Sequence, residues 1–298
     1  MRVFVAGGTG QVALSLKEAA KKENIEFMAA GRPDFDLLDT DRMRAVIKPF
    51  KPTAIINAAA YTAVDAAEEN EATATAINAD GAAALATIAS ELDVPFLHLS
   101  TDYVFDGEKD GAYLETDEVG PTGAYGRSKL TGEIAVMAAN PNAMIYRTAW
   151  VYSPFGNNFC KTMLRLAQSK DSLNIVADQY GNPTYAPDIA DALLAIIAKT
   201  GTPDGPSHYA GIYHLAGSGS TSWHGFAEKI FAESGILGHR TPSTKAITTA
   251  NYPTPAKRPA NSRLDCSKLM ETFGISLPNW QQSTIKCVKR LLEDGLLS

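Results

Sequence analysis

Cysteine is scarce in this chain. Only three occur, Cys160, Cys266 and Cys287, and no two form a CxxC pair. This pattern argues against a disulfide framework and a zinc site, and it favours buried or free thiols in a reducing compartment. The five histidines also lack the spacing of a metal-binding motif. We therefore expect no metal ion and a cytoplasmic location.

Excess positive charge and long apolar runs are missing too. Lysine and arginine number 27 against 33 aspartates and glutamates, a net charge of −6. Because nucleic-acid binding needs a basic surface, we expect no nucleic-acid partner, although a local cluster could bind a small anion. No apolar run approaches the roughly 20 residues that span a bilayer. Residues 2–6 already read as a strand, so we expect neither a membrane span nor a signal peptide.

The first half of the chain alternates strand-like and helix-like segments. This alternation is typical of an α/β fold, here a Rossmann-type doubly wound parallel sheet with helices on both faces. The predicted strands are Val3–Ala6, Ile25–Ala30, Thr53–Asn57, Pro95–Ser100 and Ala143–Arg147. The predicted helices are Gln11–Lys22, Ala66–Leu92 and Tyr125–Ala139.

The second half is less regular and predicts a smaller, interleaved C-terminal domain. Helices are expected at Asn158–Gln168, Pro187–Lys199, Ser222–Ser234 and Gln281–Leu297, with a strand at Gly211–Leu215. Three prolines make Tyr252–Pro259 a loop. We predict a nucleotide-binding domain of residues 1–152 plus about 186–216, and a substrate-binding domain of about 153–185 and 217–298.

A glycine-rich turn, Gly7–Ala13, follows the first strand and opens the first helix. This is the context that a dinucleotide fingerprint requires. Gly7 permits the tight turn, and Gly10 lets backbone amides approach a pyrophosphate. Ala13 stands where a third glycine often occurs. A glycine turn alone is a weak signal, but its position between strand and helix favours a dinucleotide site.

The end of the second strand bears on the choice of cofactor. NAD sites usually place a carboxylate there, whereas this chain has Gly31-Arg32. A guanidinium suits the 2′-phosphate of NADPH, so we predict NADPH, with NADH still possible. The alternative is that Arg32 is an ordinary surface residue. Asp36 and Leu37 could flank the adenine.

Small and hydroxyl residues follow the third and fourth strands. Ala58, Ala59 and Ala60 leave space for a ligand at the carboxyl edge of the sheet; the alternative is that they pack tightly. Ser100 or Thr101 can face a tyrosine hydroxyl across the cleft and donate to a carbonyl oxygen that gains negative charge. The alternative for this Ser-Thr-Asp run is a turn or helix cap.

Tyr125 and Lys129 are four residues apart on a predicted helix, so both side chains can point into one cleft. A nearby ammonium stabilises phenolate and lowers the pKa of a tyrosine from about 10. Tyr125 is thereby a candidate proton donor for carbonyl reduction. Taken alone, the pair is more typical of a solvated helix face, and it is the surrounding motifs that favour the catalytic interpretation.

Together these residues resemble the extended short-chain dehydrogenase/reductase superfamily and, within it, the dTDP-4-dehydrorhamnose reductase family. The resemblance covers nearly the whole chain. Besides the segments above it rests on NAAAYTAVD (57–65), STDYVFD (100–106), RTAWVY (147–152), GNNFCKTMLRL (156–166), DQYGNPT (178–184) and YPTPAKRPANSRL (252–264). It implies NADPH-dependent reduction of the C4 ketone of dTDP-4-dehydro-β-L-rhamnose to dTDP-L-rhamnose.

The resemblance also implies roles for individual residues. Tyr125 would donate the proton, Lys129 would hold the nicotinamide ribose and lower the pKa of Tyr125, and Thr101 would polarise the carbonyl. Substrate contacts would come from Thr101, Asp102, Tyr103, Tyr125 and Trp150. The predicted cofactor site comprises Gly7, Thr9, Gly10, Gln11, Val12, Gly31, Arg32, Asp36, Leu37, Ala58, Ala59, Ala60, Tyr61, Thr62, Ser100, Tyr125 and Lys129. From charge alone, Lys257-Arg258 and Arg263 could pair with the diphosphate.

The chain departs from the family pattern at one possible metal site, and two alternative functions remain. Some family members dimerise around a cation held by glutamates, but the matching positions here are Ser15 and Pro187, so we expect no divalent metal and a monomer or weak homodimer.

A nucleotide-sugar epimerase or dehydratase would share the fold; Tyr103 after Asp102 argues against a dehydratase. A non-catalytic NADP-binding regulatory subunit would have no need of Thr101, Tyr125 and Lys129 together.

Overall fold

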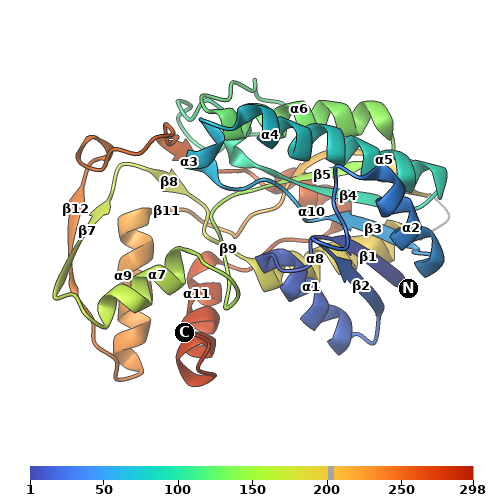
Figure 1. The fold of residues 1–298 in the computed structure, drawn as a ribbon. Helices are drawn as coiled ribbons and strands as arrows, with labels where there is room; N and C mark the ends of the chain where they lie inside the picture. The colour runs from blue at the N-terminus through green and yellow to red at the C-terminus, as the bar shows by residue number, and fades with distance from the viewer. Residues whose placement is uncertain (201–204, 298) are drawn as a thin grey trace.

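The computed structural model describes residues 1–200 and 205–297. Six parallel strands form the central sheet in the order β10-β5-β4-β3-β1-β2, as the sequence predicted for a Rossmann-type fold (Figure 1). These strands are β1 (Arg2–Ala6), β2 (Glu26–Ala30), β3 (Ala54–Asn57), β4 (Phe96–Thr101), β5 (Met144–Thr148) and β10 (Gly211–His214). The innermost strands are wholly buried because helices cover both faces.

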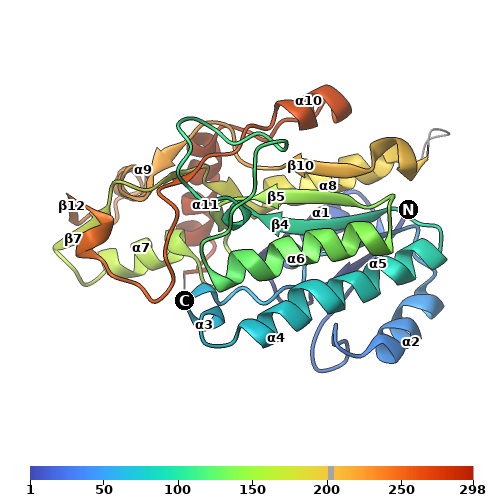
Figure 2. The same ribbon diagram turned by 90° about the horizontal axis from the view of Figure 1, so that it is seen from above.

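Helices cover the two faces of the sheet in separate layers (Figures 1 and 2). One apolar cluster joins the sheet to α1 (Gln11–Lys22) and α8 (Ala186–Thr200). The other joins it to α2 (Thr40–Phe50), α5 (Ala82–Glu91) and α6 (Ala124–Ala139). The carboxyl ends of the strands are therefore free to receive a ligand.

The alanine-rich segment predicted as one helix is helical but interrupted. It comprises α3 (Val64–Ala67), α4 (Glu71–Thr75), the π-helix η1 (Ala76–Gly81) and α5. The break falls at residues 68–70, where Asn70 donates its Nδ2 to the Ala66 carbonyl at 2.9 Å. An asparagine that bonds nearby backbone in this way competes with helix continuation.

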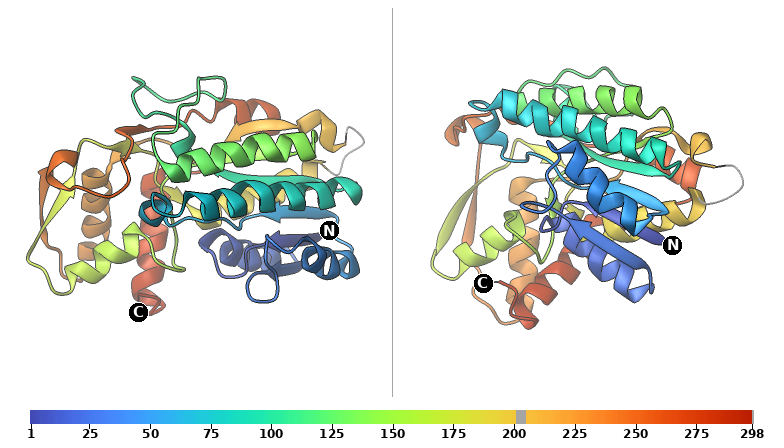
Figure 3. Two further views of the ribbon diagram at one scale, coloured as in Figure 1. Left: turned by 45° about the horizontal axis from the view of Figure 1, so that its top comes forward. Right: turned by 45° about the vertical axis from the view of Figure 1, so that its right-hand side comes forward.

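Helices α7 (Phe159–Ala167), α9 (Trp223–Ile236) and α11 (Trp280–Glu293) gather at one end of the sheet around a third apolar cluster (Figure 3). Ser222 caps α9 as predicted, accepting from Gly225 N at 3.1 Å. Short strands complete this end: β6 (Val151–Tyr152), β7 (Ser172–Val176), β8 (Tyr180–Gly181), β9 (Thr184–Tyr185), β11 (Thr221–Ser222), β12 (Ser243–Ile247) and β13 (Asn261–Ser262).

The other predicted helices and the Gly211–Leu215 strand lie within a few residues of their expected bounds, and Tyr252–Pro259 forms no helix. The sequence did not predict α2, α10 (Ser267–Phe273), the short strands or the 3₁₀ turns η2 (Asp102–Val104), η3 (Pro206–Tyr209) and η4 (Thr249–Asn251). Within residues 1–200 and 205–297, no helix has the length and apolar character to cross a membrane.

Gly132 on α6 is a test of the close packing in this layer. A Cβ at this position would lie far inside van der Waals contact of the Asn78 carbonyl oxygen in η1. We expect Gly132→Ala to lower the free energy of unfolding by about 1–3 kcal/mol, because overpacking outweighs the gain of about 1 kcal/mol in helix propensity. Urea unfolding followed by circular dichroism measures this.

Gly120→Ala is the matched control, because a Cβ there meets only the Asp106 Cβ at an ordinary 3.5 Å. Its stability should stay within about 0.5 kcal/mol of the wild type. Equal stability of the two variants would show that α6 can move away from η1.

Candidate active site

The ends of β1, β2 and β3 meet backbone to backbone at the glycine-rich turn. Gly7 has φ +114 and donates its N–H to the Ala30 carbonyl at 2.8 Å. A Cβ on Gly7 would lie 3.1 Å from Ala58 backbone atoms, and one on Gly31 would lie 2.8 Å from Gly8 N. Only residues without a side chain allow this approach.

Gly10 is the N-cap of α1 and leaves the helix N-terminus open. Nothing lies within 4 Å of where its Cβ would be, and no side chain caps the helix. Free amides and the positive end of a helix dipole attract phosphate groups. Thr9 is exposed and Val12 is largely buried at the same turn. The turn can therefore receive a pyrophosphate.

Gln11, predicted at the cofactor site, directs its side chain elsewhere. Its Oε1 accepts hydrogen bonds from Ser153 Oγ at 2.8 Å and Asn158 Nδ2 at 3.0 Å. Asn158 also caps α7 by accepting from Lys161 N at 3.1 Å. The side chain of Gln11 therefore ties the glycine turn to α7, and its backbone is the part at the turn.

The residues expected near the adenosine end differ in exposure. Arg32 is exposed, and within the described part of the chain it forms no ion pair. The Asp36 carboxylate accepts from Leu38 N at 3.0 Å, while the Leu37 side chain is buried against Gly81. Arg32 is thus available to a phosphate, whereas the side chain of Leu37 belongs to the core.

Asn78, which the sequence analysis missed, joins the cofactor loop to α6. It accepts from Tyr61 N at 2.8 Å and donates to Tyr61 O at 3.1 Å. Its Nδ2 also bonds Ser128 Oγ at 2.9 Å, and Ser128 bonds the Tyr125 carbonyl at 2.8 Å. The cofactor loop itself is half-buried at Ala58, Ala59, Ala60 and Tyr61 and exposed at Thr62. An asparagine inside an alanine-rich run was the available signal.

The structure brings Thr101, Asp102, Tyr103 and Tyr125 together at the end of β4. The rings of Tyr103 and Tyr125 meet edge to face, with centroids 5.5 Å apart. Thr101 Oγ1 donates to Asp102 Oδ1 at 2.9 Å, and the Thr101 hydroxyl favours the ionised form of Tyr125. Burial raises the pKa of Asp102 to about 6 and, with Asp102 as the next cause, raises the pKa of Tyr103 to about 12.

The expectation that Lys129 lowers the pKa of Tyr125 is wrong in this structure. Burial raises the pKa of Tyr125, and Thr101 only partly opposes this effect. Lys129 donates its Nζ to the Leu99 carbonyl at 2.8 Å, and burial lowers its own pKa to about 8. The ammonium is thus engaged by backbone, and Tyr125 stays a neutral phenol at neutral pH.

Ser100 does not face Tyr125. Its Oγ donates to Glu133 Oε1 at 2.5 Å, on the buried side of α6. Of the two candidate hydroxyls on this strand, Thr101 is therefore the one beside Tyr125. Adjacent residues of a strand point to opposite faces, which separates the two side chains.

A cavity of about 550 Å³ opens beside Tyr103, lined in part by residues of α7 and β7. Trp150, with φ +48, stacks on Trp223 at 3.6 Å between ring centroids. Arg258 donates Nη2 to Asp65 Oδ2 at 2.7 Å. The lining includes Asp65, Tyr103, Trp150, Phe159, Thr162, Met163, Leu166, Gln179, Trp223, Tyr252, Arg258 and Ser262. The cavity combines aromatic faces with a guanidinium, as a nucleotide site does.

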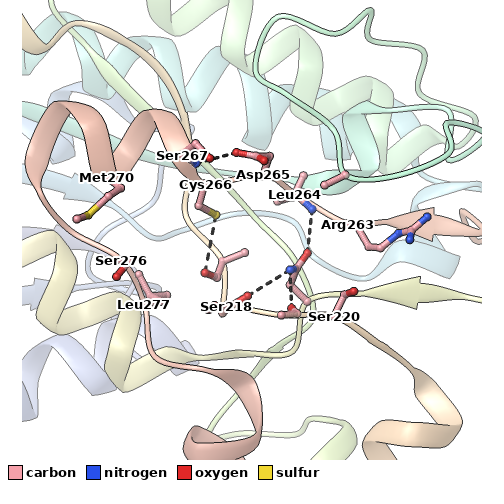
Figure 4. A pocket seen from close by; sticks show the side chains of 15 residues that line it. Ser218, Ser220, Arg263, Leu264, Asp265, Cys266, Ser267, Met270, Ser276 and Leu277 are labelled. Carbon is pink, nitrogen blue, oxygen red and sulfur yellow. Dashed lines mark hydrogen bonds between the residues drawn. The ribbon is translucent and has the colours of Figure 1, made fainter.

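Arg263 lies outside this cavity. It lines a separate cavity of about 490 Å³, and Figure 4 shows its guanidinium directed away from Cys266 and Met270. Its Nε donates to Asn261 Oδ1 at 2.7 Å, and the guanidinium lies 5.8 Å from the centre of the Tyr180 ring. Arg258 is therefore the arginine of this segment that accompanies Trp150.

Ser15 and Pro187 line one cleft of about 570 Å³, together with Asp188 and Arg290. Ser15 donates its Oγ to the Gln11 carbonyl at 2.8 Å. In the part of the chain that the structure describes, no three acidic, histidine or cysteine residues are grouped to hold a metal ion. The absence of a divalent metal stays a prediction.

Comparisons with known proteins agree with this geometry. A family model described as RmlD substrate binding domain matches residues 1–293. A dTDP-4-dehydrorhamnose reductase from Sinorhizobium fredii is 50% identical over 295 residues, covering 99% of both chains. One from Escherichia coli K12 is 40% identical over 300 residues, covering 99% of this chain and 98% of that one.

Solved structures of two dTDP-4-dehydrorhamnose reductases are also similar. The Clostridium acetobutylicum structure has a TM-score of 0.90 and 37% identity, covering 98% of this chain and 100% of that one. The Bacillus anthracis structure, in complex with NADP, has a TM-score of 0.88 and 31% identity, covering 96% and 98%.

The raised pKa of Asp102 predicts a pH-dependent stability. The folded carboxyl titrates near pH 6 and the unfolded one near 3.8, so the folded state binds more protons between these values. The free energy of unfolding should therefore fall by about 1–3 kcal/mol as the pH rises from about 4 to 6. Asp102→Asn should lack this decrease in urea unfolding at pH 4, 5, 6 and 7.

Asp106→Asn is the control, because Asp106 affects stability with the opposite dependence on pH. Hydrogen bonds from Glu108 N and Tyr113 lower the pKa of Asp106, so its contribution to stability is present above pH 3.8 and is lost at lower pH. A wild type and Asp102→Asn with parallel pH profiles would contradict the assignment.

Proposed function

The chain belongs to the RmlD substrate binding domain family, and we propose that it reduces dTDP-4-dehydro-β-L-rhamnose to dTDP-L-rhamnose with NADPH. The observation that carries this function is the meeting of Thr101, Tyr125 and Lys129 at the carboxyl edge of the sheet, beside an open glycine turn. Full-length relatives of the same activity favour a reductase over an epimerase, a dehydratase or a regulatory subunit.

In this proposal each residue has a distinct part in the reduction. Bound NADPH supplies the hydride that C4 accepts. Tyr125 donates its phenolic proton to the carbonyl oxygen, which becomes the new hydroxyl, and its raised pKa keeps that proton in place at neutral pH. Thr101 would turn its hydroxyl from Asp102 Oδ1 to donate a hydrogen bond to the oxygen as charge develops. Lys129, which bonds the Leu99 carbonyl and does not lower the pKa of Tyr125, would act through the cofactor.

The pieces of the cofactor site fit NADPH. The Gly10 turn would hold the pyrophosphate, and the exposed Arg32 would bind the 2′-phosphate. The structure of the Bacillus anthracis relative is a complex with NADP. Lys129 would hold the nicotinamide ribose. Its Nζ bonds the Leu99 carbonyl near the carboxyl end of β4.

We assign the nucleotide part of the substrate to the 550 Å³ cavity. Trp150 and Trp223 offer stacked aromatic faces, and Arg258 carries an Nη1 without a hydrogen-bond partner among the described residues. A guanidinium with a free donor pairs well with a diphosphate. We therefore favour Arg258, held by Asp65, over Arg263 as the diphosphate ligand.

The domain division, the location and the assembly expected from the sequence stay proposals. We propose that residues 1–152 with about 186–216 form the cofactor domain, and that about 153–185 and 217–298 form the substrate domain. We further propose a cytoplasmic monomer or weak homodimer. Sedimentation of the purified protein with and without substrate tests its assembly.

The reductase activity is tested with NADPH, dTDP-4-dehydrorhamnose and Tyr125→Phe. We expect substrate-dependent loss of NADPH absorbance in the wild type, and a kcat lower by about 10²-fold or more in the variant, because the proton donor is lost. NADPH affinity should change little. Tyr180→Phe, an exposed tyrosine outside the 550 Å³ cavity, is the control. A wild type that binds NADPH but oxidises none would refute the proposal.

The assignment of Arg258 is tested by comparing two arginines of one segment. Arg258→Gln should raise KM about tenfold or more, because a charge-assisted pair with the diphosphate contributes roughly 1.5–3 kcal/mol. Arg263→Gln should leave KM nearly unchanged, since its guanidinium lies outside the cavity. Steady-state kinetics with saturating NADPH distinguish the two, and the reverse ranking would return the diphosphate to Arg263.

A further inference from the structure

A buried ion pair lies behind the catalytic face of α6. Arg147 on β5 donates Nε to Glu133 Oε1 at 2.9 Å and Nη2 to Oε2 at 2.7 Å. Their side chains are 3% and 2% exposed. Desolvation of such a pair largely cancels its attraction, and apolar replacements are often as stable. Stability alone is therefore a weak reason for these two charges.

Ser100 completes the surroundings of the Glu133 carboxylate. Its Oγ donates at 2.5 Å, and Ser100 and Arg147 are paired directly in the register of β4 and β5. The Arg147 guanidinium also lies 5.0 Å from the centre of the Phe105 ring. Three hydrogen bonds from two neighbouring strands thus fix the carboxylate in one orientation.

Lys129 precedes Glu133 by four residues on the same helix, so the two side chains share a face. Lys129 is 2% exposed, and its Nζ bonds the Leu99 carbonyl. Burial disfavours the ammonium, whereas Glu133 favours it. A mobile carboxylate would draw the ammonium into a direct pair. A carboxylate held by Arg147 and Ser100 leaves Nζ at the end of β4.

We propose that Glu133 is a positioning residue for the reduction, an inference that rests on the proposed function. Its fixed carboxylate is the counter-charge that keeps the buried Lys129 ammonium protonated. Arg147 and Ser100 hold that carboxylate so that Lys129 remains directed at the cofactor site.

The other titratable groups around Lys129 do not replace Glu133. His98 on β4 is neutral, because burial and Lys129 lower its pKa well below 6.5. Tyr125, on α6, has a raised pKa, and Asp102 in η2 acts on Tyr125. Among the described residues, Glu133 is the acidic group that acts on Lys129.

The test is the pH dependence of kcat/KM and of NADPH affinity. Glu133→Gln removes the negative charge, so the alkaline limb near pH 8 should move down by about one unit. At pH 8 kcat/KM would fall about fivefold and recover near pH 6.5. Arg147→Met leaves the Glu133 carboxylate without its guanidinium partner beside Lys129. The alkaline limb of this variant should therefore move to higher pH. Damage to packing alone would not displace the two limbs in opposite directions.

Two further variants guard the interpretation. Lys129→Arg, which stays protonated, should remove the alkaline limb and thereby assign it to Lys129. Glu133→Gln/Arg147→Met replaces the buried pair without an orphan charge and covers the case in which a single variant fails to fold. This double variant should keep the shift of the alkaline limb to lower pH that is expected for Glu133→Gln.

An alkaline limb unchanged in folded Glu133→Gln and in the double variant, with an active wild type, would overturn the inference. A wild type inactive toward dTDP-4-dehydrorhamnose would instead refute the proposed function. In that case the pH dependence of NADPH binding still decides the role of Glu133: a shift to lower pH in Glu133→Gln supports it, and no shift overturns it.

Discussion

The site depends on how closely α6 approaches its neighbours. Gly126 and Gly132 place the helix backbone directly against the Tyr103 and Asn78 carbonyl oxygens, where any side chain would collide. This contact sets Tyr125 beside Thr101 and brings Lys129 within reach of β4. Since helix packing distances depend on the residues at the contact, two glycines decide the position of both functional side chains.

Burial then sets the protonation states. The same dry environment raises the pKa values of Tyr125 and Asp102 and lowers that of Lys129. Tyr125 therefore holds its proton until a substrate oxygen accepts it. Because burial lowers the pKa of Lys129 to about 8, its ammonium loses its proton only slightly above neutral pH. The fixed carboxylate of Glu133 nearby is therefore important to the reaction we propose.

Much of the fold was predictable from local patterns. The parallel strands are short apolar runs, and several helices have clear periodicity, such as α11, or a recognisable cap, such as Ser222 on α9. Helix α2 was missed because Pro49 stands inside it and charged residues interrupt its apolar ones. Strands β7 and β12 were missed because each exists through pairing with the other, from a distant part of the chain.

By itself, the sequence determined the glycine turn, the Tyr125–Lys129 spacing and the aromatic and basic residues of the substrate side, because these depend on residue type and short-range periodicity. Only the tertiary structure decided the partners. Ser100 bonds Glu133 rather than facing Tyr125, and Arg258 rather than Arg263 joins Trp150. Such choices are made between segments far apart in the chain, where burial and geometry, not local pattern, select the contact.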